Sequence, residues 1–336
     1  MKEIFGTMPN GETACLYTIS CGDITARITD LGATLVNLFV PDAAGNMDDV
    51  VLGYDSPAGY LGGTAYLGAT IGRTANRIRN GSFVLDGRTV VMPANEGPHN
   101  LHSGPDGYDS RLWQVEEHTA QSITLKLMSP DGDQGLPGNA LIHVTYTAEY
   151  NGIRISYDGI SDKDTVFNMT NHSYFNLAGH THPEKAMEQV LSMPARFFNP
   201  DDAENIPTGE LRSVEGTPMD FRTPKALGRD LNEDYDALNL QGGYDHNFEV
   251  FCNPCAILED PSSGRRMAVV TDCPGIQLYT ANFTDTVGKS GVHYGKNSGV
   301  CLETQYYPDS ANHPEWPQPI VKAGQKYRSE TIYRFG

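Results

Sequence analysis

The sequence predicts an all-β fold, a large β-sandwich with few short helices in which residues 1–336 form a single domain. Three observations predict this fold. Apolar and polar residues alternate with a period of two in many short segments, turn-forming residues separate those segments, and helical periodicity is scarce. The length of 336 residues alone would suggest about two domains, but all-β sandwiches often exceed that expectation as single domains.

The strands are expected wherever the alternation runs between turn signals. Asp86-Gly87 and Asn151-Gly152 each separate two such runs and predict tight hairpins, because both turn positions favour positive φ. A wider hairpin is predicted around Pro261-Ser262-Ser263-Gly264, and only short segments such as 223–227 could form a helical turn. The expected strands are 24–28, 34–40, 82–85, 88–92, 122–128, 141–150, 153–157, 256–259, 267–270, 277–283, 300–304 and 330–335.

The charge of the chain restricts its partners. A formal net charge of -18 argues against nucleic acid, whose phosphates favour basic surfaces, and weakly against a phosphorylated substrate. The first residues lack the apolar segment of a signal peptide, and no apolar run approaches the roughly 20 residues of a membrane helix. We therefore expect a cytoplasmic protein with neither nucleic-acid nor membrane partners.

The six cysteines are typical of a reducing compartment. Cys252 and Cys255 have the spacing of metal or redox pairs, but no second pair or nearby histidine completes a zinc site. Several of the others lie in apolar or β-like runs, where a free thiol acts as a small core residue.

The segment Thr170-Asn171-His172-Ser173-Tyr174-Phe175-Asn176-Leu177-Ala178-Gly179 combines amides, hydroxyls and an imidazole with aromatic residues. Core strands rarely contain so many polar groups, because each needs a hydrogen-bond partner when it is buried. Polar groups on an apolar platform suit a site that binds a polyhydroxylated ligand. The alternative is a buried polar network that only holds strands together.

Two loop histidines and His172 are candidate ligands or proton carriers. His99 and His102 could hold a metal on one turn, with His172 or Asp245 joining them in space. His102 and His172 could instead donate protons or hydrogen bonds near neutral pH. A structural role is open for each histidine.

Acidic and basic groups complete the candidate set. Glu303 lies at the end of an apolar strand, where burial would raise its pKa towards that of a useful base. The alternative is a structural salt bridge between Glu303 and Arg77. Asp245 lies between aromatic residues and suits hydroxyl binding, or forms an Asx turn. Arg77 beside Asn76 supplies a planar fork of donors and an amide, or a surface cation.

Together these residues predict acid–base chemistry on a neutral polyol. No phosphate-binding glycine loop, dinucleotide fingerprint or serine nucleophile elbow is present in the sequence.

The chain resembles the aldose 1-epimerase (galactose mutarotase) family nearly from end to end. The matching segments are Gly72-Arg73-Thr74-Ala75-Asn76-Arg77-Ile78, Leu101-His102, Ser129-Pro130-Asp131-Gly132, the residues from Thr170 to Leu177, Ile206-Pro207-Thr208-Gly209-Glu210, Tyr244-Asp245-His246-Asn247-Phe248, Pro274-Gly275-Ile276-Gln277-Leu278-Tyr279-Thr280 and Cys301-Leu302-Glu303-Thr304-Gln305. The chain departs from the family pattern at Ser103, usually glycine, and at Ser310, usually alanine, which puts the sugar preference in doubt.

The resemblance implies a β-supersandwich fold and an isomerase that interconverts α and β anomers of free hexoses such as galactose and glucose. It implies a proton acceptor at Glu303, a proton donor at His172, and no metal or organic cofactor. The implied sugar-contacting residues are Asn76, Arg77, His102, Tyr174, Asp245 and Gln277.

The protein would be a monomer or weak dimer. Three alternatives are a non-catalytic sugar-binding protein, a hexose-6-phosphate epimerase, which would require extra cationic groups, and a glycosidase that uses Asp245 and Glu303.

Overall fold

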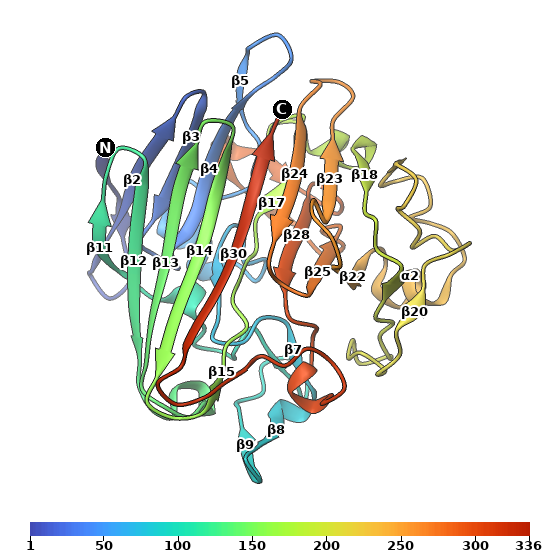
Figure 1. Ribbon diagram of the computed structural model, residues 1–336. Helices are drawn as coiled ribbons and strands as arrows, with labels where there is room; N and C mark the ends of the chain where they lie inside the picture. The colour runs from blue at the N-terminus through green and yellow to red at the C-terminus, as the bar shows by residue number, and fades with distance from the viewer.

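A computed structural model describes residues 1–336 and is built mainly from antiparallel β-sheets (Figure 1). The largest sheet has nine strands, and β13 (Ala140–Glu149), β14 (Gly152–Ser161) and β30 (Lys326–Phe335) form its centre. The other strands of this sheet are β11 (Gln114–His118), β12 (Ser122–Ser129), β18 (Val190–Ser192), β21 (Lys225–Ala226), β23 (Ala256–Glu259) and β24 (Arg266–Thr271).

A five-stranded sheet from the N-terminal part of the chain packs against β12, β13 and β14 (Figure 1). Its strands, in both sequence and spatial order, are β1 (Lys2–Thr7), β2 (Thr13–Cys21), β3 (Ile24–Thr29), β4 (Thr34–Pro41) and β5 (Met47–Asp49).

A six-stranded sheet lies behind the other half of the large sheet in Figure 1 and carries the candidate site. Its spatial order is β17 (Tyr174–Phe175), β28 (Val300–Gln305), β25 (Gly275–Tyr279), β22 (Asp245–Glu249), β19 (Phe197–Phe198) and β20 (Arg212–Ser213). Strand β28 contacts β30: the Tyr333 hydroxyl donates to the Leu302 carbonyl at 3.1 Å, and the Phe175 and Tyr333 rings lie 4.8 Å apart. The two large sheets are therefore joined through a shared core.

The remaining elements are short. The two-stranded sheets pair β6 (Thr70–Ile71) with β16 (Thr170–Asn171), β7 (Arg77–Ile78) with β10 (Asn100–Leu101), β8 (Ser82–Leu85) with β9 (Arg88–Val91), β15 (Thr165–Val166) with β29 (Ile320–Val321), and β26 (Thr286–Val287) with β27 (His293–Tyr294). The helices are α1 (Pro57–Gly62), α2 (Asp236–Gln241) and the 3-10 turns η1 (Arg79–Gly81), η2 (Tyr108–Ser110), η3 (Asp133–Gly135), η4 (Pro183–Glu188), η5 (Lys289–Gly291) and η6 (Ser310–Asn312). None of the helices is long and apolar enough to cross a membrane.

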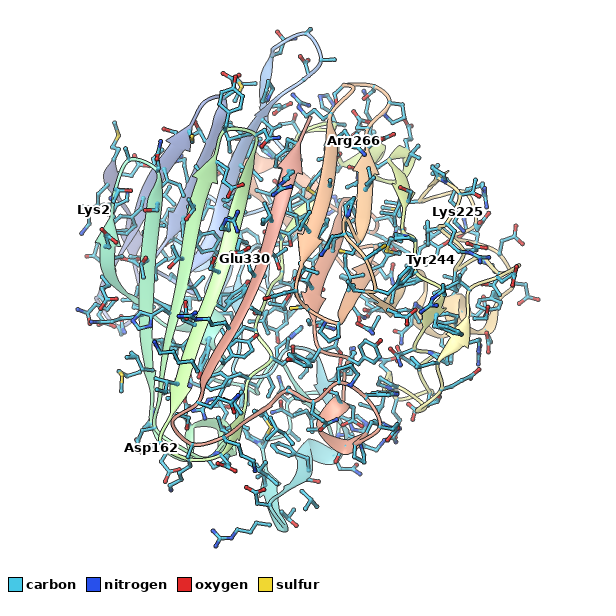
Figure 2. All side chains as sticks on the ribbon, viewed as in Figure 1. Lys2, Asp162, Lys225, Tyr244, Arg266 and Glu330 are labelled. Atoms are coloured by element: carbon cyan, nitrogen blue, oxygen red, sulfur yellow. The ribbon has the colours of Figure 1, made fainter.

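The alternation read from the sequence matches the burial of the strands. Along β13 every second residue is fully buried, and on β30 Tyr327, Tyr333 and Phe335 are buried while Arg328 and Arg334 are exposed. Glu330, labelled in Figure 2, is half-buried on the same strand. It pairs with Arg154 on β14. One apolar core of 52 residues extends from Tyr17 to Phe335 and contacts all three large sheets.

The predicted strands and hairpins are confirmed, with three corrections. Asp86 and Gly87 have φ of 49° and 74° and form the tight turn between β8 and β9. Strands β13 and β14 form the second hairpin, but its turn is Tyr150-Asn151, because Gly152 is already paired with Glu149. Gly152 is required for another reason: a Cβ there would lie 2.5 Å from the Tyr333 carbonyl oxygen.

The other two corrections concern element type and length. Residues 223–227 form no helical turn, since Lys225 and Ala226 are the edge strand β21. The strand expected over 277–283 ends at Tyr279, because Ala281 adopts a φ of 52° and turns the chain. Local periodicity cannot reveal either feature, since both depend on the neighbouring segments.

Candidate active site

The site lies on one face of the six-stranded sheet. Strand pairing aligns Asn247, Gln277 and Glu303 in one row across β22, β25 and β28. Because side chains alternate along a strand, the row two residues away faces the same side. That second row contains Asp245, Tyr279, Cys301 and Tyr174. The alternate residues face the apolar core and include Phe248, Ile276, Leu278, Leu302 and Phe175.

The segment from Thr170 to Gly179 contains both a buried polar network and residues that line the pocket. Asn171 is structural: its amide donates to the Gly68 carbonyl at 2.9 Å and to the Tyr146 hydroxyl at 3.2 Å. His172 and Tyr174 instead line the pocket and stack on each other at 5.1 Å. The buried network therefore holds the backbone that presents these two rings to the pocket.

Two loops with positive φ place Asn76 and His102 opposite that sheet. Asn76 has a φ of 59° and its backbone N–H donates to His102 Nδ1 at 3.1 Å, which leaves Nε2 of His102 available. His102 and Ser103 have φ of 51° and 74°. Glycine would adopt such a φ without strain, and Ser103 instead accepts a hydrogen bond from the Thr74 N–H at 2.8 Å. Ser310, the other departure, is buried outside the pocket.

Arg77 is held by Glu96, which the sequence reasoning did not identify. Arg77 Nε lies 2.5 Å from Glu96 Oε2, and Nη2 donates to Oε1 at 2.8 Å. The salt bridge from Arg77 to Glu303 that the sequence left open is therefore not formed. Asp245 forms no Asx turn; its Oδ1 accepts a hydrogen bond from Gln277 Nε2 at 2.7 Å.

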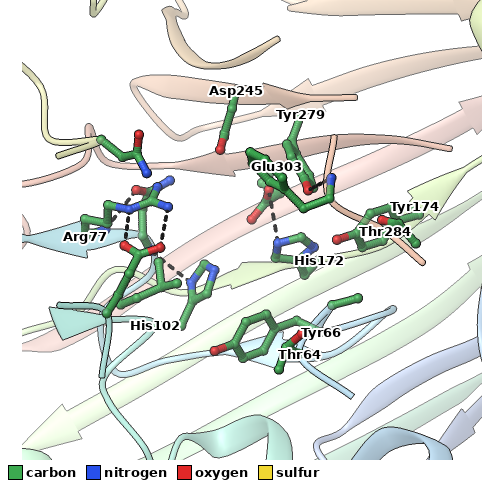
Figure 3. A pocket seen from close by; sticks show the side chains of 16 residues that line it. Thr64, Tyr66, Arg77, His102, His172, Tyr174, Asp245, Tyr279, Thr284 and Glu303 are labelled. Carbon is green, nitrogen blue, oxygen red and sulfur yellow. Dashed lines mark hydrogen bonds and ion pairs between the residues drawn. The ribbon is translucent and has the colours of Figure 1, made fainter. Parts of the chain in front are cut away.

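These residues enclose a pocket of about 200 Å³. Seven of the eight predicted site residues line it, and Gln277 lies just behind Asp245. Figure 3 shows Arg77 and His102 on one side, His172 and Glu303 near the centre, and Tyr66 facing the two histidines. The lining residues are Thr64, Ala65, Tyr66, Asn76, Arg77, Glu96, Leu101, His102, His172, Tyr174, Asn205, Asp245, Tyr279, Phe283, Thr284 and Glu303.

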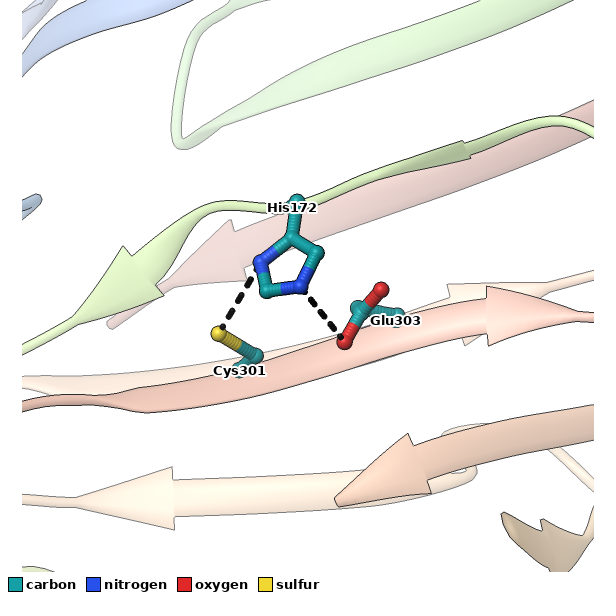
Figure 4. A group of neighbouring side chains, drawn as sticks. All are labelled: His172, Cys301 and Glu303. Carbon is teal, nitrogen blue, oxygen red and sulfur yellow. Dashed lines mark hydrogen bonds and ion pairs between the residues drawn. The ribbon is translucent and has the colours of Figure 1, made fainter. Parts of the chain in front are cut away.

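A buried imidazole and a buried carboxylate lie in contact at the centre of this pocket. His172 Nε2 lies 3.6 Å from Glu303 Oε1, and both side chains are buried (Figure 4). The other oxygen, Glu303 Oε2, is buried without a hydrogen-bond partner. Such an atom is costly unless a ligand supplies the missing partner. The pair can thus exchange a proton with a bound hydroxyl group.

Cys301 contacts the same imidazole from the opposite side. Its Sγ lies 3.5 Å from His172 Nδ1 (Figure 4). His172, Cys301 and Glu303 form the single group of three or more potential metal ligands that lie close together. However, Cys301 and Glu303 face different ring nitrogens, and one ion binds only one of them. The arrangement therefore fits a hydrogen-bonded chain better than a metal centre.

The metal site considered for His99 and His102 does not form. Each Nδ1 accepts a backbone N–H instead, from Asn80 at 3.0 Å and from Asn76 at 3.1 Å, and neither histidine belongs to a group of ligands. The Cys252–Cys255 pair likewise has no further ligand; all six cysteines are free thiols.

Burial shifts the proton affinities of the pair in opposite directions. It raises the pKa of the Glu303 carboxyl well above its usual 4.5; Asp245 acts in the same direction and Arg77 opposes it. It lowers the pKa of His172 to about 4 and that of His102 well below 6.5. Burial also raises the pKa of Asp245. Ionised Glu303 is therefore a stronger base, and protonated His172 a stronger acid, than either group would be in water.

Three residues that contact the predicted site residues were not identified from the sequence. Cys301 could have been found, because it precedes Glu303 by two residues in a strand and must share its face. Glu96 lies in a loop with no motif of its own. Tyr66, with a φ of 54°, packs its ring 4.7 Å from His102 and 5.9 Å from His172, and no local signal indicates this contact.

The fold and the pocket define a β-sandwich enzyme with a buried carboxylate–imidazole pair. Residues 16–334 match the family model described as aldose 1-epimerase. A galactose mutarotase of Bos taurus is 39% identical over 99% of this chain and 98% of its own length, and an aldose 1-epimerase of Escherichia coli (strain K12) is 36% identical over 100% and 99%.

Solved structures of similar proteins indicate the same family. An aldose epimerase homologue from C. elegans superposes with a TM-score of 0.89 at 33% identity, covering 96% of this chain and 99% of its own. A galactose 1-epimerase from Lactobacillus acidophilus NCFM gives 0.86 at 27% identity, covering 100% and 98%. The chain belongs to the aldose 1-epimerase family, and it is an isomerase of the mutarotase type with the β-supersandwich fold expected from its sequence.

Proposed function

We propose that this mutarotase interconverts the α and β anomers of free hexoses such as galactose and glucose, with Glu303 as proton acceptor and His172 as proton donor. The observation that carries the proposal is the 3.6 Å contact between these two buried groups on the pocket wall, beside an unpartnered carboxylate oxygen. The two sugar oxygens that exchange protons, O1 and the ring oxygen, are both bonded to C1. Their acid and base must therefore also be neighbours.

The reaction begins with Glu303 ionised and His172 protonated. Glu303 removes the proton from the C1 hydroxyl while His172 Nε2–H protonates the ring oxygen. The bond between C1 and the ring oxygen breaks, and C1 becomes an aldehyde. Rotation about C1–C2 then presents the other face of the carbonyl, and ring closure reverses both proton transfers.

The pair carries one proton throughout this cycle. It is on His172 before ring opening and on Glu303 afterwards, so the net charge of the pair stays at zero. Burial raises the pKa of Glu303 and lowers that of His172, which favours the uncharged arrangement and makes each group reactive in its charged form. Concerted acid and base transfer typically contributes ~10²–10⁴-fold for each group. No metal or organic cofactor is required, because an aldehyde and a hydroxyl group combine without one.

We assign the remaining predicted residues to sugar binding. Asn76, Arg77 and His102 supply donors on one side, and Asp245, fixed by Gln277, accepts from hydroxyl groups on the other. Tyr174 lines the same pocket, where it contacts the sugar, and its ring stacks on His172 and holds the imidazole plane. Membership of the family favours isomerisation over the sugar-binding, sugar-phosphate and glycosidase alternatives.

Polarimetry on freshly dissolved α-galactose tests the proposal. The optical rotation should reach equilibrium much faster with enzyme than in buffer, with heat-denatured enzyme as the control. A decay no faster than in buffer would refute it. Measuring galactose, glucose, xylose and their 6-phosphates in parallel would establish the preferred sugar.

Domain count, location and partners belong to the same proposal. We infer one domain from the continuous apolar core and a cytoplasmic location from six free cysteines. A net charge of -18 disfavours nucleic-acid partners. We further propose a monomer or weak dimer that acts on a small sugar, without a membrane partner. Light scattering after size-exclusion chromatography would test the oligomeric state.

A further inference from the structure

Arg77 is the only lysine or arginine that lines the pocket. The two imidazoles there add no net positive charge at neutral pH: the His172–Glu303 pair shares one proton and is uncharged overall, and burial lowers the pKa of His102 well below 6.5. Beyond that pair, two more carboxylates, those of Glu96 and Asp245, line the same pocket. An anionic ligand would therefore depend on Arg77 alone for a counter-charge.

The positive charge of Arg77 is already neutralised by Glu96. The two carboxylate oxygens of Glu96 accept hydrogen bonds from Nε and Nη2 of Arg77, in the forked geometry that makes such pairs strong. These are the only hydrogen bonds of the Arg77 side chain. A guanidinium has five N–H groups, so three remain to donate to neutral sugar hydroxyls. Arg77 therefore offers hydrogen-bond donors to the pocket, while the Arg77–Glu96 pair as a whole has no net charge.

Glu96 lies in a loop that is held by hydrogen bonds between its own residues. The Glu96 N–H donates to the His99 carbonyl at 3.2 Å, and the His99 N–H donates back to the Glu96 carbonyl at 2.9 Å. Asn95 bridges the loop to Leu101 in both directions, at 2.7 Å and 3.0 Å. The charge pair is thus a fixed part of the wall, and its Arg77 side chain is only 11% exposed.

We propose that Glu96 is a specificity-determining residue: by neutralising Arg77 it confines the pocket to neutral aldoses and excludes aldoses that carry a carboxylate or a phosphate. An anionic sugar would meet Glu96 and Asp245 with no free cation, and like charges placed together oppose binding. The inference deepens the proposed function and rests on it for the reaction measured.

The test compares galactose with galacturonate, which has the same ring stereochemistry and a carboxylate at C6. We expect kcat/KM of the wild-type enzyme to be at least ~10-fold lower for galacturonate. Glu96→Gln keeps the shape and one acceptor oxygen but removes the charge, and it should reduce that discrimination several-fold. Glu204→Gln is the matched control, because Glu204 lies 3.7 Å from His99 and is not bonded to Arg77.

Binding of the same two sugars, measured by calorimetry on each variant, separates this inference from the proposed function. If wild-type enzyme fails to accelerate galactose mutarotation, the proposed function is wrong, and the binding ratios alone decide the role of Glu96. The inference is overturned if the wild type binds both sugars equally. It is also overturned if Glu96→Gln weakens the binding of both sugars by the same factor. The same holds if Glu204→Gln reduces the discrimination between the two sugars as much as Glu96→Gln does.

Discussion

Glu303→Gln is the most direct test of the acid–base pair. The amide keeps the volume of the side chain and can still hydrogen-bond to a sugar, but it cannot accept the proton from the C1 hydroxyl. A general base typically contributes ~10²–10⁴-fold, which corresponds to about 3–5.5 kcal/mol of transition-state stabilisation. We therefore expect kcat/KM to fall by at least ~100-fold while galactose binding persists.

The same substitution should not destabilise the protein. The folded pKa of Glu303 lies well above its unfolded value near 4.5, so the folded state binds the proton more tightly. The contribution of this carboxyl to stability is full below pH 4.5 and is lost as pH rises through the folded pKa. Glutamine removes that loss, and the melting temperature at pH 8 should stay equal or increase.

Polarimetry and calorimetric melting on purified Glu303→Gln provide both readouts, with Glu204→Gln, an exposed glutamate changed in the same way, as the control. Wild-type turnover in Glu303→Gln would refute the assignment of the base. Loss of activity accompanied by a large drop in melting temperature would refute the reasoning about burial.

Three other expectations follow from the contacts. The kcat/KM for galactose should decline below about pH 4, where His172 becomes protonated and the His172–Glu303 pair carries two protons. It should also decline on the alkaline side, once the pair has lost its single proton. An acid limb at pH 6.5 would contradict the lowered pKa of His172. Cys301→Ala should lower kcat several-fold and KM little, because His172 Nδ1 loses its partner, whereas Cys301→Ser should retain more activity; equal rates for both variants would show that the thiol has no positioning role. Lys289→Met should reduce the free energy of unfolding by about 3–5 kcal/mol in urea titrations, since it leaves Asp49, now bonded to Lys289 Nζ at 2.6 Å, as an unpaired buried charge; a loss below about 1 kcal/mol would contradict this.

The sequence by itself determined the strands and seven of the residues that line the pocket. Period-two alternation identified β13, β14 and β30, and Asp86-Gly87 identified a hairpin, because these signals depend only on a few adjacent residues. Family resemblance singled out Glu303 and His172, and the structure places them in contact.

Only the tertiary structure decided how these residues act on one another. His172 and Glu303 are 131 positions apart in the chain, and their contact depends on the order and register of β17, β28 and β25. The partner of Arg77 was equally undetermined, because the sequence offered Glu303 and the fold selected Glu96. The opposite pKa shifts come from burial, which the packing of distant segments creates. Local sequence fixes which groups are present, and long-range packing fixes their distances and their solvation.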